Sequence, residues 1–335
     1  MLKNLCLLLL LPFFGFSQQG TLVNLDSTLS QVAYPFEVRS LQLQNQRQTL
    51  QMAYMDVKPA NPNGAVVLLL HGKNFNGAYW QNTIEKLSSL GYRVVAPDQV
   101  GFGKSSKPST YQYSFHQLAE NTKTLLDSLG IPKAMVLGHS MGGMLAARFA
   151  LMYPGSTQKL ILENPIGLED YKVMTPYQSI EKNYRNELSQ TYDKIKKYQL
   201  TNYYDGKWKP QYDRWVNLLA GWTINEHYPI MAWNAALTSD MIFTQPVLYE
   251  LNKIQVPTLL IIGTRDRTAI GKTLVSEQVR KTMGQYQLLG KQTQKKIRNC
   301  QLVELKNVGH LPHIEVFEEF MKALLPFIAQ PPQLN

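Results

Sequence analysis

The sequence predicts an α/β domain with a mostly parallel sheet, an antiparallel hairpin at its start and a helical insertion near its middle. Three observations support this fold class. Short, continuous apolar runs recur along the chain, segments of helical periodicity lie between them, and one long aromatic stretch interrupts the alternation. Strands buried on both faces produce such runs, and strands that alternate with helices form a parallel sheet with right-handed crossovers.

Length and composition narrow the class of protein further. The 335 residues are enough for one large α/β domain or for one domain with an inserted lid. With 44% hydrophobic and 17% charged residues, the chain is neither disordered nor a coiled coil. The net charge of +10 is spread along the chain without a recognition module, so we expect no nucleic-acid partner. Two cysteines are too few for a disulfide scaffold or a Cys-rich metal site, and we expect no metal.

The first residues have the pattern of a secretory signal peptide, which we assign to residues 1–17. Lys3 supplies a positive start, residues 5–14 are apolar, and Ser17 is a small residue suited to a cleavage site. The apolar run is short for a permanent span of a bilayer. We therefore expect a secreted or periplasmic protein, with a mature domain at 18–335 and no membrane anchor after cleavage. The alternative is an uncleaved anchor.

The expected elements follow in order. Residues 36–43 and 50–57 alternate apolar and polar side chains around a polar turn, which is the pattern of a hairpin with one wet face. The continuous apolar runs that predict buried strands are residues 65–70, 93–96, 134–137, 159–162 and 258–262, with a last strand at 301–305. The segments that predict helices are residues 80–90, 115–129, 141–153, 272–283 and 314–328.

The stretch at residues 167–244 contains no apolar strand run and is rich in aromatic residues. Its four tryptophans are Trp208, Trp215, Trp222 and Trp233. A long helical insertion between two strands predicts a lid, because ligands of such sheets bind at the carboxyl ends of the strands. Aromatic walls favour a small to medium, largely apolar substrate. The alternative is a peripheral insertion whose aromatics pack only among themselves.

Residues 138–142 match the pattern G-x-S-x-G, and their context makes the match informative. The motif follows one predicted buried strand and opens the helix that begins near Met141. A sharp strand-to-helix turn would lift Ser140 out at the top of the sheet, with the positive end of the helix facing its oxygen. We expect Ser140 to be a nucleophile. The alternative is an exposed serine on an ordinary turn.

A serine nucleophile needs a base and an acid that orients the base. His310 lies on a loop between the last predicted strand and the last predicted helix, so we expect it to be the base, with His313 as the alternative. Asp266 follows the strand at 258–262 and is the expected acid, whereas Glu163 is the second candidate. All of these positions fall at the carboxyl edge of the sheet.

The transition state of acyl transfer carries a negative oxygen that backbone N–H groups must receive. We expect one N–H from Met141, the residue after the nucleophile. The second should come from the loop after the strand at 65–70, where Lys73 is the first choice and Asn74 the second. Gly72 allows the backbone to approach, and His71 is expected to be structural.

Together these residues resemble the α/β-hydrolase superfamily, in particular its lidded, esterase-like members. The matching features are His71-Gly72 followed by Trp80, the D-x-x-G-x-G-x-S loop at 98–105, the elbow at 138–143, and Asp266 with Gly309-His310. The resemblance covers residues 36–328 and implies eight strands, no cofactor and a structural role for the 98–105 loop. The chain differs from haloalkane dehalogenases and epoxide hydrolases, which use an aspartate nucleophile, and from the G-G-S-W-G elbow of proline iminopeptidases.

The resulting expectation is a serine hydrolase that cleaves carboxylic esters of small molecules through an acyl-enzyme. Other reactions open to the same residues are hydrolysis of C–C or amide bonds and perhydrolysis. A third possibility, from another class, is a protein that binds a small molecule and turns it over slowly.

Overall fold

The computed structural model describes residues 22–331 of the chain. The predicted signal peptide, residues 1–17, therefore lies outside the described residues. None of the helices between residues 22 and 331 combines the length and the apolar character needed to cross a membrane.

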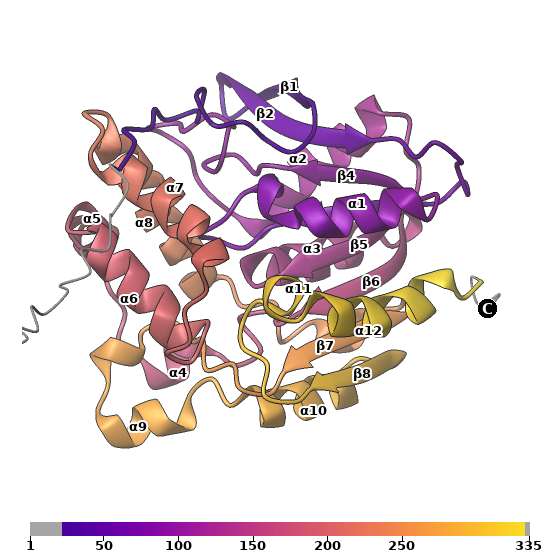
Figure 1. Ribbon diagram of the computed structural model, residues 1–335. Coiled ribbons are helices and arrows are strands. Elements are labelled where there is room, and N and C mark those ends of the chain that lie inside the picture. The colour runs from indigo at the N-terminus through magenta and orange to yellow at the C-terminus, as the bar shows by residue number, and fades with distance from the viewer. Residues whose placement is uncertain (1–21, 332–335) are drawn as a thin grey trace, which may run out of the picture.

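Eight strands form one sheet in the order β1-β2-β4-β3-β5-β6-β7-β8, as Figure 1 shows. The β1–β2 and β2–β4 pairs are antiparallel and all other neighbours are parallel. The expected fold class is thus confirmed, hairpin included. The strands are β1 (Val38–Asn45), β2 (Gln48–Val57), β3 (Val66–Leu70), β4 (Arg93–Pro97), β5 (Ala134–His139), β6 (Thr157–Glu163), β7 (Thr258–Gly263) and β8 (Cys300–Leu305).

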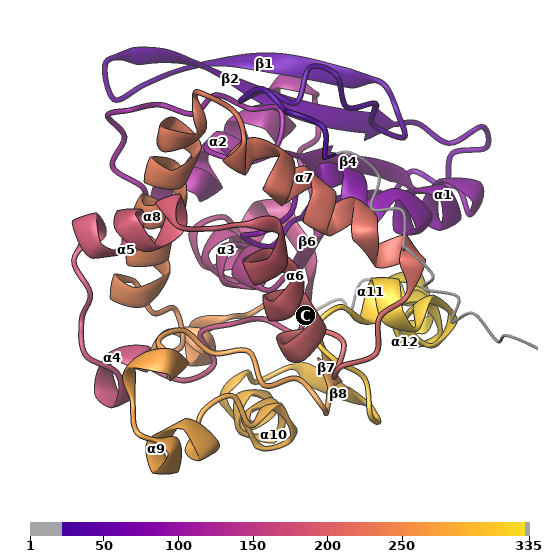
Figure 2. The ribbon, with the colours of Figure 1, turned by 60° about the vertical axis from the view of Figure 1, so that its left-hand side comes forward.

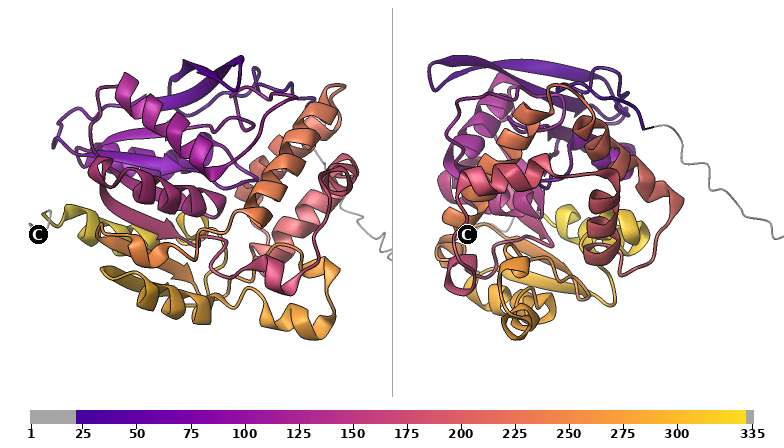
Figure 3. Two further views of the ribbon diagram at one scale, coloured as in Figure 1. Left: turned by 180° about the vertical axis from the view of Figure 1, so that it is seen from behind. Right: turned by 90° about the vertical axis from the view of Figure 1, so that its left-hand side faces the viewer.

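Helices cover both faces of this sheet, which explains why its central strands are continuously apolar. Successive residues of β3 alternate between two cores: Val67 and Leu69 pack with one, Leu68 and Leu70 with the other. Helices α1 and α12 lie over one face, and α2, α3 and α10 over the other (Figures 1 and 3). These helices are α1 (Gln81–Ser89), α2 (Phe115–Ser128), α3 (Met141–Met152), α10 (Tyr286–Lys296) and α12 (Phe317–Ala329).

The insertion between β6 and β7 is helical, as expected. It lies beyond the carboxyl ends of the parallel strands, and Figure 2 brings this side of the molecule forward. Its helices are α4 (Tyr171–Met174), α5 (Ile180–Leu188), α6 (Tyr192–Asn202), the 3-10 turn η3 (Pro210–Tyr212), α7 (Asp213–Thr223) and α8 (Tyr228–Thr244). The remaining short elements are η1 (Gly77–Trp80), η2 (Pro154–Ser156), η4 (Leu251–Lys253), η5 (Lys272–Leu274), α9 (Glu277–Thr282) and α11 (Pro312–Glu315).

One predicted helix differs from the observed structure, and one observed helix was not predicted. The helix expected at 272–283 is divided into η5 and α9, because the side chain of Ser276 accepts a hydrogen bond from the Val279 amide and so starts a new helix. Helix α10 was not predicted, since its sequence is largely polar and gives little apolar periodicity. Gly290 of α10 packs against Ile262 of β7.

Candidate active site

The predicted nucleophile, Ser140, lies at a sharp turn between β5 and α3. Its backbone has φ 58° and ψ −121°, a region that residues with side chains rarely occupy. Two glycines make the turn possible. A Cβ on Gly138 would overlap the carbonyl of Gly142, and a Cβ on Gly142 would overlap the carbonyl of Leu70. The turn therefore places Ser140 at the amino end of α3, as the G-x-S-x-G pattern indicates.

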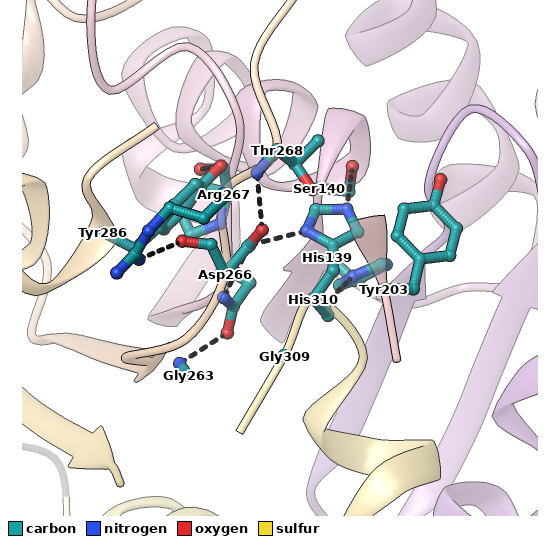
Figure 4. A network of polar contacts seen from close by, with 12 residues as sticks. His139, Ser140, Tyr203, Gly263, Asp266, Arg267, Thr268, Tyr286, Gly309 and His310 are labelled. Atoms are coloured by element: carbon teal, nitrogen blue, oxygen red, sulfur yellow. Dashed lines mark hydrogen bonds and ion pairs between the residues drawn. The ribbon is translucent and has the colours of Figure 1, made fainter. Parts of the chain in front are cut away.

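The structure brings Ser140, His310 and Asp266 together in one hydrogen-bonded row (Figure 4). The Oγ of Ser140 lies 3.0 Å from Nε2 of His310, and Nδ1 of His310 lies 2.7 Å from Oδ2 of Asp266. The imidazole and the carboxylate are almost fully buried, at 1% and 0% exposure. This geometry allows the serine hydroxyl to donate to a neutral imidazole, whose other nitrogen donates to the carboxylate.

Asp266 is surrounded by donors that favour its ionised form. Asn164 Nδ2 donates to Oδ2 over 2.8 Å, and the Thr268 amide donates to Oδ1 over 2.8 Å. Burial by itself would raise the pKa of Asp266. The charge and hydrogen bond of His310, with the bonds from Thr268 and Asn164, outweigh that effect and hold the pKa below its ordinary value. Asp266 therefore remains a carboxylate that can stabilise a protonated imidazole.

Asn164 was not identified from the sequence. It has φ 36° and follows the last residue of β6, beside the end of β7. Its Oδ1 accepts from the Gly263 amide while its Nδ2 holds Asp266. The neighbouring Arg265 contacts Glu315 at 2.6 Å rather than the Asp266 carboxylate. One feature of the sequence could have revealed Asn164. It is a polar residue directly after the buried strand β6, and β6 is paired with β7, the strand that precedes Asp266.

The two alternatives considered for base and acid, His313 and Glu163, form a pair with each other. Both the backbone amide and Nδ1 of His313 lie within hydrogen-bonding distance of Glu163 Oε1, at 2.9 and 2.8 Å. The His313 ring also stacks on Trp80, with ring centroids 4.2 Å apart. Burial raises the pKa of Glu163 to about 7 and lowers that of His313 well below its ordinary value. Their mutual contact occupies these atoms, so neither takes the position of Asp266 or His310.

His139, which occupies the first x position of the G-x-S-x-G pattern, belongs to a second buried network of hydrogen bonds. Its Nε2 lies 2.7 Å from the carbonyl oxygen of His310, and its Nδ1 lies 3.0 Å from the hydroxyl of Tyr79. The same hydroxyl accepts a hydrogen bond from the Gly72 amide over 3.0 Å. Tyr79 was not identified from the sequence, because its role depends on how η1 packs against β5.

The loop after β3 lies directly against Ser140. A Cβ on Gly72 would come within 3.1 Å of the Ser140 Cβ, so only a small residue fits there. Lys73 and Asn74, the two candidates for the second oxyanion donor, follow Gly72 immediately. Met141, the expected first donor, is the first residue of α3, where an amide has no intrahelical acceptor. The expected donors are thus on the two segments that flank Ser140.

The lid contacts this loop and the His310 loop. Lys73 Nζ forms an ion pair with Glu187 of α5 at 2.9 Å, and Asn74 Nδ2 donates to the hydroxyl of Tyr203 over 3.1 Å. The ring of Tyr203, which directly follows α6, stacks on His310 with centroids 5.0 Å apart. The lid therefore covers the His310 ring and contacts the loop that lies against Ser140.

A cavity of about 430 Å³ lies between the lid and the loop that bears Lys73 and Asn74. Of the four lid tryptophans, Trp222 lines it. Trp215 instead packs against Phe75, with ring centroids 5.9 Å apart. The volume is within the range of small-molecule sites. In residues 22–331, no cluster of three or more His, Cys, Asp or Glu side chains could hold a metal ion.

Residues 65–315 match the sequence profile of the family described as the alpha/beta hydrolase fold. The chain belongs to this family. A crystal structure of a probable hydrolytic enzyme from Pseudomonas aeruginosa PAO1 resembles this α/β hydrolase over almost its whole length. The two are 48% identical, the match covers 92% of this chain and 99% of the other, and the TM-score is 0.91.

Two curated relatives resemble a shorter part of this α/β hydrolase. The 2-hydroxy-6-oxo-6-phenylhexa-2,4-dienoate hydrolase of Burkholderia cepacia is 40% identical over 31% of this chain and 38% of its own length. Epoxide hydrolase 2 of Siraitia grosvenorii is 38% identical over 30% of this chain and 32% of its own length. The chain thus matches about a third of these relatives. The comparisons support a hydrolase of the α/β fold.

Proposed function

We propose that this α/β hydrolase cleaves carboxylic esters of small molecules through an acyl-enzyme, with Ser140 as nucleophile, His310 as base and Asp266 as orienting acid. The single observation that carries the proposal is the unbroken row of contacts, 3.0 Å from Ser140 to His310 and 2.7 Å from His310 to Asp266. A serine hydroxyl becomes a useful nucleophile only with such a base.

In the proposed cycle, the Ser140 oxygen attacks the ester carbonyl while His310 Nε2 accepts the serine proton. The carbonyl oxygen becomes an oxyanion, which the amides of Met141 and Lys73 receive by hydrogen bonds, with Asn74 as the alternative to Lys73. The tetrahedral intermediate collapses, and His310 returns the proton to the departing alcohol. A water molecule, activated by His310 in the same way, then releases the acid and regenerates Ser140.

A second candidate reaction is hydrolysis of a C–C bond on the same three residues. The observation that favours it is the similarity to the Burkholderia cepacia enzyme, because the name of that enzyme's substrate contains a ketone and no ester. Amide hydrolysis and perhydrolysis use the same geometry. Opening of an epoxide has less support, since it proceeds in the family through an aspartate nucleophile and the elbow here bears Ser140.

A protein that binds a small molecule with little turnover is the remaining alternative. A fluorophosphonate probe separates it from a hydrolase, because only an activated serine reacts rapidly. We expect fast labelling of wild type at Ser140 and none in Ser140→Ala. Chromogenic esters of increasing acyl length, assayed beside aminoacyl arylamides and a vinylogous 1,5-diketone, then identify the bond that is cleaved.

We also propose that the protein acts outside the cytoplasm, in the periplasm or after secretion. The apolar, singly basic start of the chain supports this location. No nucleic acid, metal or cofactor enters the proposed cycle, and its expected partner is a small-molecule substrate.

A further inference from the structure

Two neighbouring loops carry the proposed acid and the proposed base. The acid loop, residues 264–268, follows β7, and the base loop, residues 306–311, follows β8. Strands β7 and β8 pair in parallel, so both loops leave the same edge of the sheet. Their backbones meet where the Arg265 amide donates to the carbonyl of Val308 over 3.0 Å. His310 lies two residues beyond this contact, so the position of its imidazole depends on what holds the rest of the loop.

The carboxylate of Glu315 contacts both loops. Its Oε2 accepts a hydrogen bond over 2.8 Å from the amide of Gly309, the residue directly before His310. Its Oε1 accepts over 2.6 Å from Nη2 of Arg265, the residue directly before Asp266. Glu315 ends the single turn of α11, so its side chain can return to the loop that precedes this helix. One side chain therefore holds the residue before the proposed acid and the residue before the proposed base.

The guanidinium of Arg265 makes a further contact with the base loop. Its Nη1 donates to the carbonyl of Asn307, and its Nε lies 3.7 Å from Asp205, which follows α6 in the lid. A planar guanidinium that binds several groups at once has a fixed orientation. The side chains of Arg265 and Glu315 are 15% and 16% exposed, so their charges are screened less than those of a surface pair.

The base loop is enclosed at Gly309. A Cβ on this glycine would overlap the carbonyl of Tyr203 and would come within 3.0 Å of Arg265 Nη2 and of Glu315 Oε2. Removal of the Glu315 carboxylate would take the acceptor from the Gly309 amide and open space on one side of the loop. His310, the next residue, could then shift.

We propose that Glu315 and Arg265 are positioning residues whose ion pair clamps the base loop to the acid loop. The clamp holds the imidazole of His310 within reach of both Ser140 and Asp266. This inference rests on the proposed function and adds two residues to it, which act through the loops and do not touch the reacting atoms. Since a displacement of about 1 Å can lower a rate by about a hundredfold, the clamp should act on the rate of reaction and not on substrate binding.

The test follows both the rate and the final extent of labelling of Ser140 by a fluorophosphonate probe, together with kcat and KM on a p-nitrophenyl ester. Wild type is compared with Glu315→Ala, which removes the clamp, and with two milder changes. Glu315→Gln keeps one of the two accepting oxygens, and Arg265→Lys keeps the charge without the planar fork. Glu250→Ala is the matched control, because it also removes a carboxylate that is paired with a buried arginine, Arg148, but lies outside both loops.

We expect Glu315→Ala to be labelled to the same extent as wild type but about tenfold or more slowly, with kcat lowered in parallel and KM within about twofold. Glu315→Gln and Arg265→Lys should lie between these two, and Glu250→Ala should match wild type. A purely structural role for the ion pair predicts a different result, in which fewer molecules are labelled and the remainder react at the wild-type rate.

That result would overturn the proposal, as would wild-type rates in both Glu315→Gln and Arg265→Lys, or equal slowing in Glu250→Ala. A higher KM with unchanged kcat in Glu315→Ala would overturn it as well. If Glu315→Ala does not fold, the two milder variants decide by the same criteria. Absence of labelling at Ser140 in wild type would instead refute the proposed function.

Discussion

The Nε2 of His139 lies 2.7 Å from the backbone carbonyl oxygen of His310, so the residue before the proposed nucleophile contacts the loop of the proposed base. Burial, followed by the positive charge that His310 can carry, lowers the pKa of His139 well below its ordinary value. A neutral His139 that donates from Nε2 must accept at Nδ1, where the Tyr79 hydroxyl donates. Because Tyr79 also accepts from the Gly72 amide, one chain of hydrogen bonds joins the loop beside Ser140 to the loop of His310.

Tyr79→Phe tests this chain. The substitution removes only the hydroxyl and leaves the buried Gly72 amide and the His139 Nδ1 without their partner. We expect the free energy of unfolding to fall by about 1–3 kcal/mol, because buried unpaired groups are costly, and kcat to fall with it as the loops lose their positions. Tyr92→Phe is the control, since Tyr92 is buried without a hydrogen bond from its hydroxyl in the described part of the chain. Equal stability and kcat in Tyr79→Phe and wild type would contradict the coupling.

The proposed catalytic residues make a second prediction. Ser140→Ala or His310→Ala should lower kcat by on the order of 10⁴ or more while the fold remains intact, and Asp266→Asn should be similarly severe because the imidazole loses its orienting carboxylate. Steady-state kinetics on a chromogenic ester, with circular dichroism to verify folding, provide the measurement. If Asp266→Asn is close to wild type and Glu163→Gln is inactive, the assignment of the acid is wrong.

Glu163 gives a prediction about stability and pH. Burial raises its pKa from 4.5 to about 7, so the folded state retains a proton that the unfolded state releases. The contribution of Glu163 to the free energy of unfolding is fully present below about pH 4.5. It falls as the pH rises toward 7, by up to about 3 kcal/mol. Glu163→Gln resembles the protonated form and should avoid this loss.

Urea unfolding between about pH 5 and about pH 8 measures the effect, read as the stability of Glu163→Gln minus that of wild type. The difference should grow as the pH rises. The buried His139 and His313, whose pKa values are lowered, gain stability as the pH rises in both proteins, so the difference between the two proteins is measured rather than the stability of wild type alone. The exposed Glu318→Gln is the control and should differ from wild type by the same amount at every pH. A constant difference for Glu163→Gln would show that Glu163 has no raised pKa.

The strands, the elbow and the order of the proposed catalytic residues could be predicted from the sequence, because they depend on local pattern and chain order. Contacts that depend on packing between distant segments could not. Buried strands such as β5 and β7 can be recognised as continuous apolar runs, because both of their faces are covered. The elbow can be recognised by its glycines, which are required because a Cβ would overlap backbone atoms. Asn164 and Tyr79 have no such local pattern. Each acquires its contacts only when the sheet and η1 bring it beside Asp266 or His139.

Export of the protein is a prediction from the sequence alone. The mature chain should begin near Gln18, with the apolar start removed. Mass spectrometry of the protein from its native host, after separation of cytoplasmic and extracytoplasmic fractions, checks this directly. Intact Met1 in a soluble cytoplasmic fraction would rule it out, and intact Met1 in the membrane fraction would indicate an uncleaved anchor.

The last prediction concerns the lid tryptophans, which the structure divides by their surroundings. Trp222 lines the cavity, and its Nε1 donates to the carbonyl of Asp26 over 2.9 Å. Trp215 is 5% exposed and packs against Phe75 and Tyr79, with centroids 5.9 and 6.2 Å apart. Truncation of a ring that lines the cavity enlarges the space for substrate, whereas truncation of a buried ring leaves a void inside the protein.

Trp222→Ala should therefore raise kcat/KM for long-chain esters relative to short-chain esters. Trp215→Ala should mainly lower thermal stability, by about 3–5 kcal/mol in the free energy of unfolding. Trp233→Ala is the control for loss of a lid tryptophan, since Trp233 is not among the residues that line this cavity and its Nε1 donates to the carbonyl of Ser109 over 3.0 Å. The measurement is the ratio of kcat/KM for a long and a short p-nitrophenyl ester, taken with the melting temperature of each variant. If Trp222→Ala leaves this ratio at the wild-type value, the cavity beneath the lid does not hold the acyl chain, and the substrate must approach Ser140 from another side.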